Sequence, residues 1–281
     1  MLFLFISCRN NSSNFNQFSH SEKVNKSFQI VLIDSIIEAE KSIPYFKGID
    51  SLNLFNDKIK TVFFDSISCN LNFNPGKNYN IEKHEIEKQR NALSKMYLND
   101  SSTIDQNELI DSSSMVFTNL ILNNIIPYWF GTEWDFNGYS SNPKEGFIAC
   151  GYFVSTTLMD MGLNLNRYKL AQQGPENEAK SISINLADVL YFNCENINEE
   201  LRSLEKGVYF IGLDNHVGYL YLTDNNAYFI HSNYIEGVVM IETTEYSEAF
   251  YSSNYYVSKI TSNKSLIIKW LKNEEVEIVK H

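Results

Sequence analysis

The sequence predicts an α+β protein in which a helix that begins with a cysteine packs on an antiparallel sheet that carries histidines, with a helical extension before it. Apolar residues at helical spacing dominate the first half of the 281-residue chain. Short strand-like runs bounded by turn residues follow from residue 189 onward. Cys150 lies where a loop of small and polar residues gives way to an apolar run typical of a helix. His216 and His231 fall in two neighbouring strand-like runs.

Three helical segments are predicted before the cysteine. Apolar spacing places them at 27–42, 81–98 and 107–124, and prolines follow the first and the third. Polar, turn-forming residues separate them. We therefore divide the chain into an N-terminal signal remnant with a polar tether at 1–20, a helical extension at 21–106 and an α+β domain at 107–281.

Five short strands are expected after the cysteine helix, which Gly162 ends. They are predicted at residues 189–192, 208–212, 216–222, 227–232 and 238–243.

Strand geometry places the two histidines relative to each other. A two-residue turn at 224–225 or 225–226 puts His216 and His231 on the same face of the sheet. With the turn at 224–225, His231 lies opposite Gly218, at a diagonal distance of roughly 7 to 8 Å from His216. Gly218 then leaves room for an imidazole ring, whereas a three-residue loop would move one histidine to the other face.

Composition excludes some classes of function. The formal net charge of -11 and the pI near 5.0 argue against nucleic-acid binding, which usually needs a basic face. No apolar run approaches the roughly 18 residues that span a bilayer. We expect a chain that is soluble or anchored at a membrane surface.

The N-terminus offers such an anchor. Residues 1–7 form a short apolar stretch before Cys8, similar to the end of a bacterial lipoprotein signal, and a polar tether follows. Lipidation of Cys8 would attach an extracytoplasmic protein to a bacterial membrane, and the alternative is a frayed cytoplasmic terminus. In an exported protein Cys69 and Cys194 could form a disulfide, and otherwise they are two free thiols.

A cysteine at a helix N-terminus, followed by two histidines, is the outline of a thiol nucleophile with a base and an orienting group. The N–H groups of the first helical turn favour a thiolate, as would a protonated His216. We therefore expect the pKa of Cys150 to fall below about 8.5. His216 would pass its proton to a leaving amine, and His231 would hold the ring of His216 in the correct tautomer.

Six segments resemble, in the same order, motifs of the NlpC/P60 family of papain-like cysteine peptidases. Residues 127–132 (Pro-Tyr-Trp-Phe-Gly-Thr) are similar to Pro-Tyr-x-Trp-Gly-Gly, and residues 146–151 (Gly-Phe-Ile-Ala-Cys-Gly) to Gly-Phe-Asp-Cys-Ser-Gly. Residues 162–167 (Gly-Leu-Asn-Leu-Asn-Arg) resemble Gly-Ile-x-Leu-Pro-Arg. The other three matches are Gly-Val-Tyr-Phe at 207–210, His-Val-Gly-Tyr-Leu at 216–220 and Phe-Ile-His-Ser at 229–232.

The resemblance implies a papain-like fold and a catalytic role for four residues. Cys150 would be the nucleophile, His216 the base and His231 the orienting residue. Tyr128 would help the backbone N–H of Cys150 to form the oxyanion hole. Members of the family commonly cleave amide bonds in the stem peptides of bacterial cell walls. The expected substrate is therefore a peptide or a peptidoglycan fragment.

The chain also departs from the family pattern. The Asp and Ser that flank the family's cysteine are Ala149 and Gly151 here, which puts substrate recognition in doubt. Residues 134–145 look like an insertion that forms a lid, a ligand-binding rim or simply a structural loop. Our candidate substrate-binding residues are Trp134, Asp135, Gly151 and Arg167.

Other chemistries have less support in the sequence. The segment His-Glu-Ile-Glu-Lys at 84–88 lacks the second histidine of a zinc-protease helix, and no cysteine pair has zinc spacing. We expect neither a metal nor another cofactor. The alternatives to a cysteine hydrolase are a peptide- or glycan-binding protein on the same scaffold and a thioester or acyl-transfer enzyme.

Overall fold

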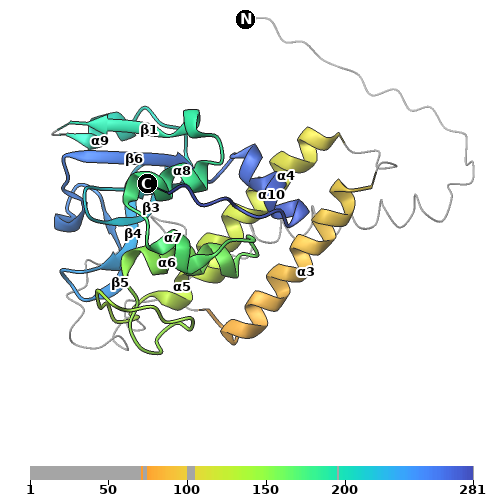
Figure 1. Ribbon diagram of the computed structural model, residues 1–281, viewed down its shortest axis with the longest axis horizontal. Helices are drawn as coiled ribbons and strands as arrows, with labels where there is room; N and C mark the ends of the chain where they lie inside the picture. The colour runs from red at the N-terminus through yellow and green to blue at the C-terminus, as the bar shows by residue number, and fades with distance from the viewer. Residues whose placement is uncertain (1–70, 72–74, 100–104, 195, 281) are drawn as a thin grey trace, which may run out of the picture. The chain divides into compact units, whose positions relative to one another are not determined.

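A six-stranded antiparallel open sheet with helices packed on it forms the core of the fold, which is α+β as predicted (Figure 1). The structure, a computed structural model, describes residues 71, 75–99, 105–194 and 196–280. All of them belong to one unit, Leu52–His281. The predicted helix at 27–42, Cys8 and Cys69 lie outside the described residues.

The strands lie in the order β1-β6-β2-β3-β4-β5, and every neighbouring pair is antiparallel. The five predicted strands are present with ends shifted by at most one residue, and β6, which separates β1 from β2, was not predicted. The bounds are β1 (Leu190–Asn193), β2 (Gly207–Gly212), β3 (Val217–Leu222), β4 (Ala227–Asn233), β5 (Val238–Thr243) and β6 (Asn254–Lys259).

The hairpin between β3 and β4 confirms the predicted register. Leu222 pairs with Ala227 and Tyr219 with Ile230, so the turn lies at 224–225. A Cβ atom added to Gly218 would lie 2.9 Å from the Cβ of His231 and 2.7 Å from the carbonyl oxygen of Ile230. Glycine is therefore required where the backbone passes His231, as the sequence suggested.

Helices cover one face of the sheet. Helix α6 (Cys150–Asp160) packs on β3 and β4, and α8 (Pro175–Ser183) packs on β2 and β6. The hydroxyl of Tyr219 in β3 lies 2.6 Å from Oγ1 of Thr157 in α6, which fixes the helix on the sheet. The short helix α7 (Arg167–Ala171) packs against α6, and the 3₁₀ turn η3 (Leu186–Asp188) follows α8.

A hydrophobic cluster covers the other face. Helix α9 (Ile197–Leu201) and the 3₁₀ turn η4 (Glu248–Phe250) pack there against Phe229 of β4 and its neighbours. Successive side chains along each strand therefore point alternately toward the face that α6 covers and the face that α9 covers, as expected for a sheet buried on both sides.

The helices that precede Cys150 are part of the same core. Helix α3 (Tyr79–Tyr97) packs against α4 (Gln106–Leu120) and α10 (Lys264–Lys272), and Figure 1 shows these three helices together, away from the sheet. A π-helix (Ile121–Ile125) and α5 (Ile126–Trp129) continue α4. The helix that we placed in an extension thus contributes to the core, and the domain boundary at 106 stays a prediction.

One hydrogen-bonded chain ties α3 to the cysteine helix. The Tyr79 hydroxyl donates to Asp160 at 2.6 Å and accepts from the Trp129 indole at 2.9 Å. None of the described helices is both long and apolar enough to cross a membrane.

Candidate active site

Cys150 is the first residue of α6, as predicted, and the backbone before it is held from two sides. The N–H of Ala149 donates to the carbonyl of Gly138 at 2.9 Å, and the Ser232 hydroxyl donates to the carbonyl of Ile148 at 2.7 Å. A Cβ on Gly138 would lie 2.6 Å from the nitrogen of Ile148. The inserted loop and β4 therefore fix where the helix begins.

The ionisation of Cys150 differs from our expectation. Burial, and then the charge of Glu178, raise the pKa of the Cys150 thiol to about 11. The backbone N–H groups of Val217, Gly151 and Cys150 itself lower this pKa, but they do not outweigh burial. The expected lowering is therefore wrong for this state, because the sulfur is desolvated at the helix N-terminus.

His216 and His231 form a hydrogen-bonded pair. Nε2 of His216 lies 2.7 Å from Nδ1 of His231, and both residues are buried. Burial lowers the pKa of His216 well below its ordinary value, with a smaller contribution from His231, and lowers that of His231 to about 3. Both rings are thus neutral near pH 7, and the backbone N–H that follows His216 faces the Cys150 sulfur.

Glu242 in β5 completes this chain, and the sequence reading missed it. Its Oε1 lies 2.9 Å from Nε2 of His231, and the carboxyl group is buried. The signal was an acidic residue in the apolar run Val-Val-Met-Ile-Glu-Thr at 238–243. The alternation of β5 puts this acid on the face that carries His231, because Phe229, two residues from His231, pairs with Glu242.

The side chain of Tyr128 is held by α3. Its hydroxyl donates to Glu82 at 3.4 Å, and its ring lies 5.1 Å from that of Tyr79 between centroids. Burial and the Glu82 carboxylate raise the pKa of Tyr128. The described contacts thus connect Tyr128 to α3, and its contribution to an oxyanion hole stays a prediction.

The inserted segment is a structured loop along the edge of β5. The N–H of Trp134 donates to Gly237 and that of Ile148 donates to Glu133, at 2.8 and 2.9 Å. The half-buried Trp134 ring lies 6.3 Å from the ring of Tyr234, which lies 5.2 Å from that of His216. Trp134 therefore contacts the histidine pair through Tyr234.

Exposed groups on the same loop surround a shallow cavity of about 270 Å³. Asp135 lies at its edge, and its carboxylate accepts the N–H of Asn137 at 2.8 Å. Phe136, Tyr139 and Phe147 on this loop are exposed aromatic residues. Asp135 is thus accessible, as a substrate contact would need to be.

Arg167 and Gly151 have packing roles in this structure. The buried guanidinium of Arg167 donates to the carbonyls of Ser140 and Tyr139 at 3.0 and 2.8 Å and to Thr156 at 2.7 Å. It therefore joins the inserted loop to α6. A Cβ on Gly151 would lie 2.9 Å from the carbonyl oxygen of Ala171, so glycine allows α6 to approach the next segment. The structure gives neither residue an exposed position at Cys150.

Glu178 in α8 is a second buried acid near the thiol. Its Oε1 lies 3.1 Å from the Cβ position of Gly151, and its Oε2 has no hydrogen-bond partner among the described residues. Burial raises its pKa well above the ordinary value. Sequence reading missed it because α8 was not predicted.

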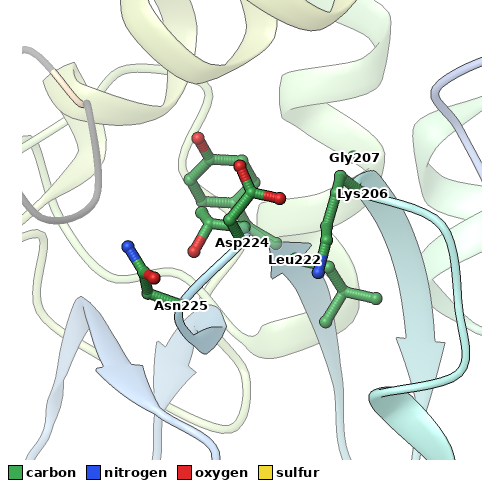
Figure 2. A pocket seen from close by; sticks show the side chains of 7 residues that line it. Lys206, Gly207, Leu222, Asp224 and Asn225 are labelled. Atoms are coloured by element: carbon green, nitrogen blue, oxygen red, sulfur yellow. The ribbon is translucent and has the colours of Figure 1, made fainter. Parts of the chain in front are cut away.

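Another pocket lies away from these residues. It has a volume of about 440 Å³, and Figure 2 shows Lys206, Leu222, Asp224 and Asn225 around it. These residues lie at the end of β3 opposite to His216. Among the described residues, no three His, Cys, Asp or Glu side chains gather in a way that could hold a metal ion.

Comparisons with family models, with curated proteins and with solved structures found no match to this chain. The class of protein must therefore be argued from the site itself and from the motifs around it.

Proposed function

We propose that the protein is a cysteine hydrolase of the NlpC/P60 type, with a papain-like fold, that cleaves amide bonds in peptides of the bacterial cell wall. The observation that carries this proposal is the His216–His231 pair at 2.7 Å, together with the N–H of Val217, the residue after His216, which faces the sulfur of Cys150 at the start of α6. The order of the six motifs supports it. Lipidation of Cys8 would place the enzyme outside the cytoplasm, where that substrate lies.

The charge state of the site defines how the thiol is activated. Because burial keeps Cys150 as a thiol and His216 as a neutral imidazole, the resting site is not an ion pair. His216 removes the thiol proton as the sulfur attacks the amide carbonyl, and gives it to the leaving amine. A thioester remains, which water hydrolyses with His216 as the base. The N–H of Cys150 stabilises the tetrahedral oxyanion, and the hydroxyl of Tyr128 adds a second donor when it turns from Glu82 to the substrate.

The test is cleavage of purified muropeptides by the wild type and by Cys150→Ala. We expect the variant to lose detectable cleavage, measured as new amine ends by mass spectrometry, because no other group replaces the nucleophile. Cys194→Ala is the matched control and should retain the wild-type rate. Retained cleavage in Cys150→Ala would contradict the proposal.

A binding protein on the same scaffold is the second candidate. The thiol pKa of about 11 and the exposed aromatic rings of Phe136, Tyr139 and Phe147 favour it. It predicts that the wild type leaves muropeptides intact but binds them in calorimetry, with weaker binding for Tyr139→Ala.

A further inference from the structure

The buried carboxylate of Glu242 accepts hydrogen bonds from three directions. Its Oε1 lies 2.9 Å from Nε2 of His231, 2.6 Å from the hydroxyl of Ser247 and 3.3 Å from the amide nitrogen of Asn233. The orientation of the Asn233 amide is fixed, because its Oδ1 accepts the N–H groups of Ile235 and Glu236 at 2.7 and 3.1 Å. Its NH₂ group must therefore donate toward Glu242.

The position of the proton on each histidine ring follows if the Glu242 carboxylate accepts a hydrogen bond from His231. A neutral imidazole has one N–H and one bare nitrogen. If Glu242 accepts from Nε2 of His231, then Nδ1 of His231 is bare and accepts the proton of His216 Nε2. Nδ1 of His216 is then bare as well, which makes it the basic nitrogen of the site.

We propose that Glu242 is a positioning residue that sets the direction of the hydrogen bonds in the His216–His231 pair and so leaves Nδ1 of His216 without a proton, as the proposed base must be. This inference rests on the proposed function. Without an acceptor at Glu242, both histidines can adopt the reverse tautomer. Nδ1 of His216 then carries a proton and cannot serve as a base.

Protonation of Glu242 would have the same consequence as its removal. Among the described residues, the titratable group that contacts its carboxylate is His231 on β4. The hydrogen-bonding side chains of Asn233 on β4 and Ser247 after β5 do not titrate. Burial raises the pKa of Glu242, and the hydrogen bond from Ser247 lowers it. Activity should therefore fall on the acid side, as this carboxylate gains a proton.

The experiment compares the wild type with Glu242→Met and Glu242→Gln in full-length protein. Two-bond ¹H–¹⁵N spectra of ¹⁵N-histidine-labelled protein distinguish Nδ1–H from Nε2–H tautomers, and His216→Gln assigns the signals. We expect Nε2–H for both histidines in the wild type, and a shift toward Nδ1–H in Glu242→Met. Glu242→Gln keeps an acceptor oxygen facing Asn233 and Ser247, so it should retain the wild-type tautomers.

A functional readout accompanies the spectra. Glu242→Met should slow both muropeptide cleavage and alkylation of Cys150 by iodoacetamide about tenfold or more, and Glu242→Gln should restore much of the rate. Cys194→Ala is a control, because it leaves every described hydrogen bond to Glu242 in place. Circular dichroism shows whether each variant is folded. If Glu242→Met does not fold, the tautomers and rates of Glu242→Gln are compared with those of the wild type.

The outcomes separate the two proposals. A wild type with Nδ1–H on His216, or a folded Glu242→Met variant with unchanged tautomers, overturns the role of Glu242. The expected tautomers in a wild type that cleaves no amide would support the role of Glu242 in the histidine pair and overturn the hydrolase.

Discussion

Two buried carboxyl groups lie on opposite sides of the candidate active site, and their surroundings differ. Glu242, on the histidine side, accepts from three donors. Glu178, on the α8 side, has an oxygen without a hydrogen-bond partner among the described residues. Donors stabilise a carboxylate, whereas burial without donors stabilises the protonated acid. Burial raises the pKa of both acids, and at Glu242 the hydrogen bond from Ser247 opposes that rise. The comparison teaches that donors on the histidine side favour the carboxylate, whereas burial at Glu178 favours the protonated acid.

The largest expected effect tests how tightly the histidine side is packed. In Gly218→Ala the new Cβ would lie 2.7 Å from the carbonyl oxygen of Ile230 and 2.9 Å from the Cβ of His231. Moving these backbone and Cβ atoms aside requires a shift of the β3–β4 pair. We therefore expect a loss of about 3 kcal/mol in the free energy of unfolding, measured in urea. The hydrogen bond between His216 and His231 should weaken as well.

Gly76→Ala is the matched control for that substitution. A Cβ at Gly76 meets nothing within 4 Å, so stability should change by less than about 0.5 kcal/mol. Equal stability of the two variants would show that β3 and β4 separate easily, and the histidine side would then not be rigid.

The next effect concerns the charge of Glu178. Its pKa in the folded protein is raised well above the ordinary value, so the folded state keeps a proton that the unfolded state releases. Stability is therefore full below about pH 4.5 and falls by about 1.4 kcal/mol for each pH unit up to the folded pKa. Glu178→Gln should remove this fall and become more stable than the wild type as pH rises.

Urea unfolding from pH 5 to 8 measures the difference between wild type and Glu178→Gln. The buried histidines are present in both proteins, so their opposite pH dependence cancels in that difference. If the free energy of unfolding changes with pH in the same way in both proteins, Glu178 is ionised in the folded state. The contrast drawn between Glu178 and Glu242 would then be wrong.

The smallest expected effect is on the α8 side. In Gly151→Ala the Cβ would lie 2.9 Å from the carbonyl oxygen of Ala171 and 3.1 Å from Oε1 of Glu178. Alanine also gains about 1 kcal/mol of helix propensity, which offsets part of the strain. We expect a net loss of about 1 kcal/mol in thermal unfolding. A stabilised variant would show that this side is loosely packed.

Local patterns in the sequence determined much of the fold and of the site. The runs around Cys150, His216 and His231 gave the start of α6 and strands β3 and β4, because helix and strand periodicity need only neighbouring residues. Turn residues at 224–225 then gave the register that places both histidines on one face. The sequence missed β6, which lies between β1 and β2, because its polar residues weaken the alternation.

Long-range contacts decided the rest. Glu242 reaches His231 only because β5 pairs with β4, and Glu178 lies behind the thiol only because α8 packs on the sheet. The pKa values of Cys150 and the histidines were likewise decided by tertiary structure, since burial outweighs the local effect of a helix N-terminus. The sequence by itself determined which groups are the candidates for the chemistry, whereas their charge depends on the groups that the fold places around them.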